Sequence, residues 1–268
     1  MKHTNQRGVT LVEIAIVLVI IGLLLGGILK GQELINSAKV RSIVDRQQSL
    51  KVSWFAFIDR YQALPGDYVY ARQNIGGAGE AVPIGGGGDG VGFGDGVIVE
   101  GESPHALQHM TGAGFLRCPQ CTYNEKTTVK PQADNSLQNQ YGGIMAIFVD
   151  GPNLETKSGF ADGTYATDAA AAADRQARLM VHTGNNIPSN ILAETDRKMD
   201  DGQPSLGDFR ASIYKSQGLT VPLGCIDTDA TNTVQDDANA DYTSLADKAG
   251  WRYADVTPEQ NCSAVVVI

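Results

Sequence analysis

The chain has 268 residues and a mass of 28.5 kDa, with 42% hydrophobic and 19% charged residues. This composition is ordinary for a folded protein and excludes a chain that is disordered throughout. The net charge is −9, from 21 basic and 30 acidic residues, which disfavours the phosphate backbone of a nucleic acid as the main partner. The apolar residues are concentrated near the N-terminus, which is therefore the most informative part of the sequence.

Residues 1–8 form a short polar segment that carries Lys2 and Arg7 and no acid. Residues 9–29 then form an apolar run with a single charged residue, Glu13. As a helix this run would be roughly 31 Å long, about the thickness of the hydrocarbon core of a bilayer. The basic flank predicts a cytoplasmic N-terminus. Because no small-residue cleavage site follows the run, we expect the apolar segment to stay on the mature protein.

The residues at the start of the run, Arg7, Gly8, Val9 and Glu13, resemble the class III signal of type IV pilins and type II secretion pseudopilins. The resemblance implies that a prepilin peptidase cuts between Gly8 and Val9, and that the new N-terminal Val9 is methylated. Glu13 matches the glutamate that the family keeps in its hydrophobic helix. The leader length, the glycine, the glutamate spacing and the apolar run all agree. Val9 departs from the phenylalanine usual at this position.

Physical chemistry gives Glu13 a reason to act in assembly. A carboxylate in an apolar helix is costly in lipid unless it meets a cation. Cleavage would expose the α-amine of Val9, which Glu13 of a neighbouring copy would neutralise inside a helical bundle. That pairing would set the axial register of the copies. The alternative is an uncleaved signal anchor with an accidental glutamate, which the spacing makes the weaker interpretation.

Residues 30–63 are predicted to continue the same helix beyond the apolar run. They contain no proline, and their apolar residues recur at spacings of three, four or seven, as on one face of an amphipathic helix. The sequence Leu64-Pro65-Gly66-Asp67 is a stop and turn, so the spine should end near Ala63. Lys30 stands where family members often carry a proline, which favours a minor or specialised subunit.

The rest of the chain predicts a head of short elements. Residues 74–101 are glycine-dense and read as a long loop. Residues 103–116 and 189–199 read as helices, with Ser103 and Ser189 as N-terminal caps and Pro104 in a first turn. The strand candidates are residues 143–149, 178–183, 209–214, 219–226 and 263–268.

A long helix followed by a run of strands predicts an α+β protein. The expected architecture is pilin-like: a helical spine, transmembrane in its first half, packed on a globular head with an antiparallel sheet. The predicted domains are a removed leader (1–8), a transmembrane and assembly helix (9–29), an amphipathic continuation of the spine (30–64) and the head (65–268).

Cys118 and Cys121 have the C-x-x-C spacing of redox centres and zinc sites. A zinc ion would need two further ligands, and His105 and His109, one helical turn apart, are the nearest candidates. Outside the cytoplasm, however, such a pair oxidises to a local disulfide, which is the favoured interpretation. A thioredoxin-type centre would also need a helix after the motif, and the polar residues 122–140 predict none.

Cys225 and Cys262 resemble the pair that closes a C-terminal loop in type IV pilins, and the resemblance implies a second disulfide between them. A loop of this length would stabilise the fold by about 3–4 kcal/mol. Four cysteines allow three pairings, and the sequence alone does not exclude the other two.

Acidic residues cluster in two places where calcium would find oxygen ligands. The first cluster lacks the residue order of an EF-hand, so acids on solvated turns are the favoured interpretation and no cofactor is predicted, with calcium as the alternative. The two clusters are Asp89, Asp95, Glu100 and Glu102 in the glycine-dense stretch, and Asp196, Asp200 and Asp201 at a turn.

No catalytic motif is present. The sequence lacks the nucleophile elbow of hydrolases, the paired histidines of zinc proteases and the phosphate loop of nucleotide hydrolases. His182 lies in a strand candidate and is interpreted as a packed or surface residue rather than a general base. We therefore expect a protein that is not an enzyme.

These observations predict a structural subunit of a type IV pilus or a related pseudopilus, polymerised through its N-terminal helix. Its partners would be copies of itself, other pilin-like subunits, the prepilin peptidase and an inner-membrane assembly platform, with no nucleic acid. It would lie in the inner membrane before assembly and in an extracellular or periplasmic filament afterwards. The rival hypothesis is a membrane-anchored extracytoplasmic enzyme, or a redox or zinc protein, that uses Cys118 and Cys121.

Overall fold

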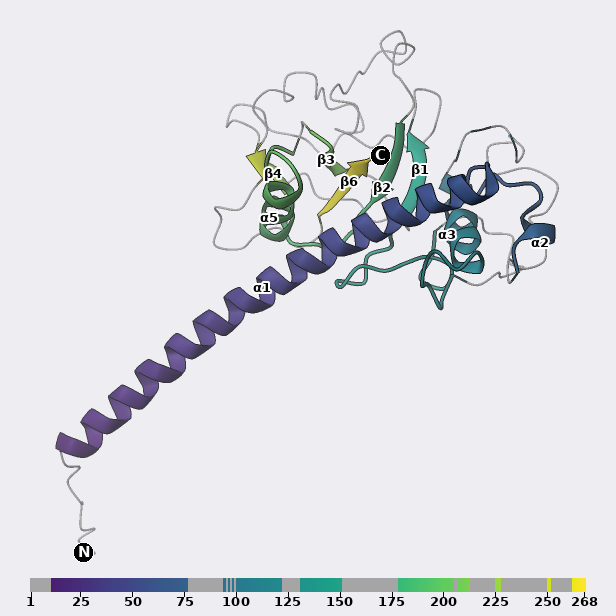
Figure 1. Ribbon diagram of the computed structural model, residues 1–268. Helices are drawn as coiled ribbons and strands as arrows, with labels where there is room; N and C mark the ends of the chain where they lie inside the picture. The colour runs from purple at the N-terminus through teal and green to yellow at the C-terminus, as the bar shows by residue number, and fades with distance from the viewer. Residues whose placement is uncertain are drawn as a thin grey trace, which may run out of the picture. The chain divides into compact units, whose positions relative to one another are not determined.

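The computed structural model of the protein describes residues 11–76, 94, 96, 98, 100–121, 131–150, 178–204, 207–212, 225–227, 250–251 and 262–268. The chain divides into two compact units, Met1–Lys39 and Val40–Ile268. The long helix α1 (Leu11–Tyr61) begins in the first unit and ends in the second, which also contains the head (Figure 1). Most of the glycine-dense loop predicted at 74–101 lies outside the described residues, as do Asp89 and Asp95.

Helix α1 spans Leu11–Tyr61 without a break, as the absence of proline predicts. It continues through Gly22 and Gly26, although each glycine lowers helix propensity by about 1 kcal/mol. Among the described residues it is the only helix that is long and apolar enough to cross a membrane. None of its most apolar 18-residue window is buried within the protein.

The end of α1 is fixed by backbone conformation. Gln62 has a φ of 50° and Gly66 a φ of 98°, so the chain turns at the predicted stop sequence. The N–H of Asp67 donates to the carbonyl of Leu64 at 3.3 Å and closes the turn. A Cβ on Gly66 would lie only 3.1 Å from the Cβ of Ala106, so glycine lets the turn pack directly against helix α3 (Ser103–Gly112).

The head contains a four-stranded antiparallel sheet in the order β1-β2-β6-β3. Its strands are β1 (Ala146–Asp150), β2 (Arg178–His182), β3 (Phe209–Ser212) and β6 (Ser263–Val267). They confirm four strand candidates, with ends shifted by a few residues. Of the fifth, residues 219–224 lie outside the described part, and Ile226 begins β4 (Ile226–Asp227), which pairs with β5 (Gly250–Trp251).

Two hydrophobic clusters join the head part of α1 to the rest of the unit. One face of α1 contributes Val40 and Ile43 to the first cluster, and Leu50, Trp54 and Phe57 to the second. This face confirms the predicted amphipathic pattern. The first cluster also contains Ile187, Leu192, Phe209, Trp251 and Val266, and the second Leu107, Met110, Ile147, Phe148 and Val181. The fold is therefore pilin-like: a long helix with an apolar first half, packed along its second half on an antiparallel α+β head.

The predicted serine caps are wrong. Helix α3 (Ser103–Gly112) follows Glu102 as its N-cap, and helix α5 (Ser189–Met199) follows Pro188, without a capping side-chain hydrogen bond at either. The reason at α3 is tertiary, because the Ser103 hydroxyl accepts the N–H of Ile147 in β1 at 2.8 Å. Two short elements complete the described structure, α2 (Ala71–Asn74) and the 3₁₀ turn η1 (Glu100–Glu102).

Candidate functional site

The N-terminal part of α1, taken by itself, presents an exposed apolar surface. Its large side chains are exposed, with Leu11 at 85% and Leu23 at 73% of their accessible area. A soluble protein seldom exposes a contiguous apolar patch of this size, so the surface is suited to lipid or to other apolar helices. Glu13 is the acid in the first turn of this helix, while Gly8 and Val9 lie outside the described residues.

All four cysteines of the chain form disulfides, Cys118–Cys121 and Cys225–Cys262. The Cα atoms are 5.2 Å and 5.7 Å apart respectively. All four side chains are buried, with Cys225 and Cys262 in the first hydrophobic cluster and Cys118 and Cys121 in the second. A sulfur in a disulfide is not a thiolate ligand, so this arrangement does not fit the zinc site considered from the sequence.

The two disulfides should differ in their effect on stability. Replacing Cys225 and Cys262 by alanine opens a loop of sequence separation 37 and should lower the free energy of unfolding by about 3–4 kcal/mol. The same change at Cys118 and Cys121, with a separation of 3, should cost about 2 kcal/mol through loop entropy. Urea unfolding of the full chain in detergent micelles, followed by tryptophan fluorescence, measures both. Equal losses would contradict the loop-entropy explanation.

His109 is a core residue of the head. It is 2% exposed, it lies beside Phe57 with ring centroids 6.1 Å apart, and its Nδ1 accepts the N–H of Gly66 at 3.0 Å. Burial, assisted by the nearby His105, lowers the pKa of His109 to about 3. The neutral ring therefore links α3 to the turn after α1, which explains its place without a metal ion.

His182 in β2 is also packed, as the sequence interpretation allowed. Its ring stacks on Phe148 with centroids 4.2 Å apart, and Nδ1 lies 3.4 Å from the hydroxyl of Ser212. Burial lowers the pKa of His182 to about 3. A serine beside a histidine can form a nucleophile and its base, but both side chains are at most 2% exposed and do not meet solvent.

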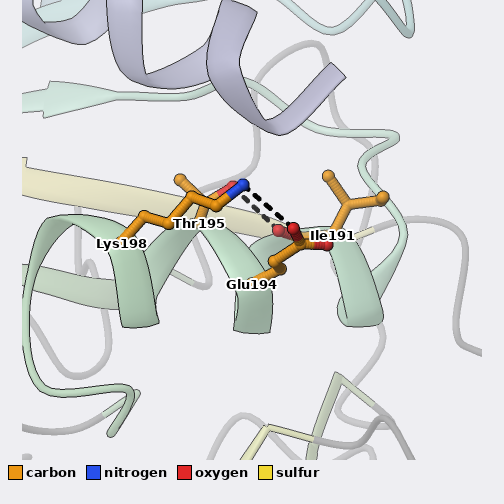
Figure 2. Close-up of polar contacts among 4 residues, drawn as sticks. All are labelled: Ile191, Glu194, Thr195 and Lys198. Atoms are coloured by element: carbon orange, nitrogen blue, oxygen red, sulfur yellow. Dashed lines mark hydrogen bonds and ion pairs between the residues drawn. The ribbon is translucent and has the colours of Figure 1, made fainter. Parts of the chain in front are cut away.

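Helix α5 contains Asp196, the buried member of the acidic cluster formed by Asp196, Asp200 and Asp201. Along this helix Lys198 pairs with Glu194 at 3.0 Å, and the Thr195 hydroxyl donates to the carbonyl of Ile191 at 2.7 Å (Figure 2). Because Asp196 follows Thr195 on the buried side, its carboxylate is enclosed, at 0% exposure. The expectation of solvated turn acids is therefore wrong for Asp196, and it is also wrong for Glu102 at the start of α3, which is 2% exposed.

The carboxylates of Asp196, Asp200 and Asp201 lie within 4.8 Å of one another, the only described group of this kind. Each of them already accepts hydrogen bonds from the protein. Asp196 accepts the indole N–H of Trp251 at 2.6 Å and the N–H of Gly202 at 3.2 Å. Burial nevertheless raises the pKa of Asp196 to about 6. These hydrogen bonds explain the convergence of the three acids, so the cluster is not evidence for a cofactor.

Sequence reasoning missed one buried polar residue that organises the head, Asn139. Its Nδ2 donates to the carbonyls of Thr183 and Asn185, at 3.0 Å and 2.8 Å. Its Oδ1 accepts the N–H groups of Tyr141 and Gly143, at 2.8 Å and 2.9 Å. The local sequence, an asparagine shortly before a glycine turn, predicts this role only weakly. Two of the four hydrogen-bond partners of Asn139 lie more than forty residues away in the sequence.

The comparison with known families adds one finding. Residues 3–29 match the family model described as the prokaryotic N-terminal methylation motif. The chain thus carries the motif typical of type IV pilins and pseudopilins, proteins that are usually structural and not enzymes. The matched segment contains Gly8, Val9 and Glu13 and ends where the apolar run ends. No curated protein and no solved structure matches the chain.

Proposed function

We propose that the protein is a structural subunit of a type IV pilus or a related pseudopilus, polymerised through α1. The observation that carries the proposal is the methylation motif at residues 3–29, followed directly by an apolar helix surface that the protein leaves exposed. The pilin-like head on the second half of the same helix supports it. No catalytic role is proposed, since the buried serine–histidine pair and the disulfide at Cys118–Cys121 both lack the access that catalysis needs.

In this proposal the prepilin peptidase removes residues 1–8 on the cytoplasmic side, and Val9 becomes the methylated N-terminus. Residues 9–29 hold the subunit in the inner membrane and later pack against other subunits. Glu13 of one copy pairs with the Val9 amine of its neighbour, because an unpaired charge of either sign is costly in an apolar bundle. The head, residues 65–268, then lies outside the cytoplasmic membrane, where disulfides form and persist.

The subunit's partners are copies of itself, other pilin-like subunits, the peptidase and an inner-membrane assembly platform. The final location is an extracellular or periplasmic filament. The size of the head and the presence of Lys30 in place of a proline favour a minor or specialised subunit. The net charge of −9 argues against nucleic acid as the ligand of the head.

Intact-mass spectrometry of the protein from its native host tests the proposal. We expect the loss of residues 1–8 together with the addition of one methyl group on Val9. Replacing Gly8 by leucine should leave the chain uncleaved, because the peptidase reads this glycine. A matched change at Gly22, where a Cβ meets nothing within 4 Å, should leave processing intact. Native protein that retains Met1 or Lys2 would overturn the proposal.

A further inference from the structure

The two edge strands of the head sheet, β1 and β3, pose a general problem. An edge strand presents backbone N–H and C=O groups that can pair with a strand of another chain. In the head, hydrogen bonds from neighbouring segments occupy N–H groups on both edges. At β1 the N–H of Ile147 donates to the hydroxyl of Ser103 at 2.8 Å. The β3 edge is covered more fully.

The outward-facing groups of β3 follow from its register. The strand pairs Arg210 with Val265 and Ser212 with Ser263, and the N–H of Val267 donates to the carbonyl of Asp208 at 2.8 Å. Even-numbered residues of this segment therefore bond to β6. Because the bonding direction alternates along an antiparallel strand, the N–H groups of Phe209 and Ala211 point away from the sheet.

Both outward N–H groups are occupied by the turn that follows α5. The carboxylate of Asp200 accepts the N–H of Phe209 at 3.1 Å, and the carbonyl of Pro204 accepts the N–H of Ala211 at 2.8 Å. The Asp200 carboxylate also accepts the N–H of Asp208. We call residues 200–204 together with 207–208 the Asp200 turn.

The backbone of the Asp200 turn is shaped to admit this carboxylate. Gly207 has a φ of 73°, and a Cβ there would lie 1.7 Å from Oδ2 of Asp200, so only glycine leaves the space. At the other end, the N–H of Asp200 donates to the carbonyl of Asp196 at 2.6 Å, and Gly202 has a φ of 81°. The turn is thus anchored to α5 on one side and to β3 on the other.

We propose that the Asp200 turn shields the β3 edge from strand pairing with a second copy of this chain, and that Asp200 is the residue that holds the shield in place. A second copy is the fitting partner because it presents the same edge, so two β3 strands can pair antiparallel about a twofold axis. The strand Phe209–Ser212 carries one charged residue, Arg210, so the favoured registers pair Phe209 with Phe209, or Ala211 with Ala211, of the second copy, because they keep the two arginines from lying directly opposite. The two copies would then form one continuous sheet. This contact is separate from filament assembly through α1.

The test uses the full chain in detergent micelles. Asp200→Ala removes the acceptor of Phe209, so in dilute samples, where the copies do not associate, the amide hydrogen exchange of Phe209 and Ala211 should become at least about tenfold faster. Sedimentation at increasing protein concentration should then show association beyond that of the unchanged chain. Asp201→Ala is the matched control, because Asp201 accepts only the N–H of Gln203 among these hydrogen bonds, and it should match the unchanged chain in both measurements.

Unchanged exchange at Phe209 and Ala211 would show that Asp200 does not hold the turn, and would overturn the proposal. Faster exchange without added association would overturn it as well, since the uncovered edge would then not be adhesive. If Asp200→Ala does not fold, Asp200→Asn decides by the same two measurements. The amide keeps the shape and one oxygen acceptor without the charge, so a smaller rise in exchange and in association is expected.

Discussion

Replacing Glu13 by alanine is expected to give a subunit that enters the membrane and is processed but does not enter filaments. Insertion should persist because the change removes the only charge from residues 9–29. Cleavage should persist because Gly8 and the basic leader are unchanged. Assembly should fail because the amine of Val9 on the neighbouring copy would be buried without a partner, at a cost of about 3–5 kcal/mol.

A second acid on the same helix provides the matched control. Glu33 pairs with Lys30 at 2.5 Å, and both side chains are about two-thirds exposed. Exposed pairs of this kind contribute about 0–1 kcal/mol, so Glu33→Ala should still form filaments. Cell fractionation, intact mass and sheared-filament yield are measured for both variants. Normal filament yield from Glu13→Ala would show that the glutamate has no part in assembly.

The spine could be predicted from the sequence because its signals are local and repeated. Residues 9–29 are apolar apart from Thr10 and Glu13, and beyond Lys30 the apolar residues keep the helical period over many turns. The stop at Leu64-Pro65-Gly66-Asp67 is also local, since proline and glycine restrict the backbone directly. The observed helix ends at Tyr61, within two residues of the predicted end.

The ends of shorter elements were harder to predict, because tertiary contacts decide them. Ser103 is an ordinary N-cap by sequence, yet its hydroxyl accepts the N–H of Ile147, which lies 44 residues away in the chain. The predicted helix 103–116 ends at Gly112, and Gly114 then turns with a φ of 81°. The N-cap preference of serine depends only on neighbouring residues, so it does not predict that β1 lies beside Ser103.

The polar residues of the head show the same limit. Asp196 is close to Asp200 and Asp201 in the sequence, so a turn with solvated acids was a reasonable prediction. Its burial depends on Trp251, which donates to it from 55 residues away. Both cysteine pairs are confirmed, although four cysteines allow three pairings. The C-x-x-C spacing favoured the local disulfide, and the resemblance to type IV pilins implied the pair Cys225–Cys262.

Acid should destabilise the head strongly between pH 6.5 and pH 4. The pKa of His109 and of His182 is about 3 in the folded state, against 6.5 as the ordinary value. The folded state therefore binds fewer protons than the unfolded state, so stability is fully present above pH 6.5 and is lost as the pH falls towards 3. At pH 4 each histidine accounts for a loss of about 3 kcal/mol. Asp196, with a pKa raised to about 6, has the opposite sign and offsets part of the loss.

Urea unfolding of the full chain in micelles from pH 7.5 to pH 4 measures this loss, with the buried Trp54 and Trp251 as reporters. Asparagine at position 109 or 182 places an amide near the former Nδ1 and does not titrate. Each substitution should lower the number of protons taken up on unfolding by about one, so the free energy of unfolding should depend less steeply on pH. This holds whatever stability the substitution loses at pH 7.5. Asp196→Asn should steepen the loss instead, because it removes the group that gains stability on protonation. If both histidine variants kept the pH dependence of the unchanged chain, burial of neutral rings would not be the cause of the acid sensitivity.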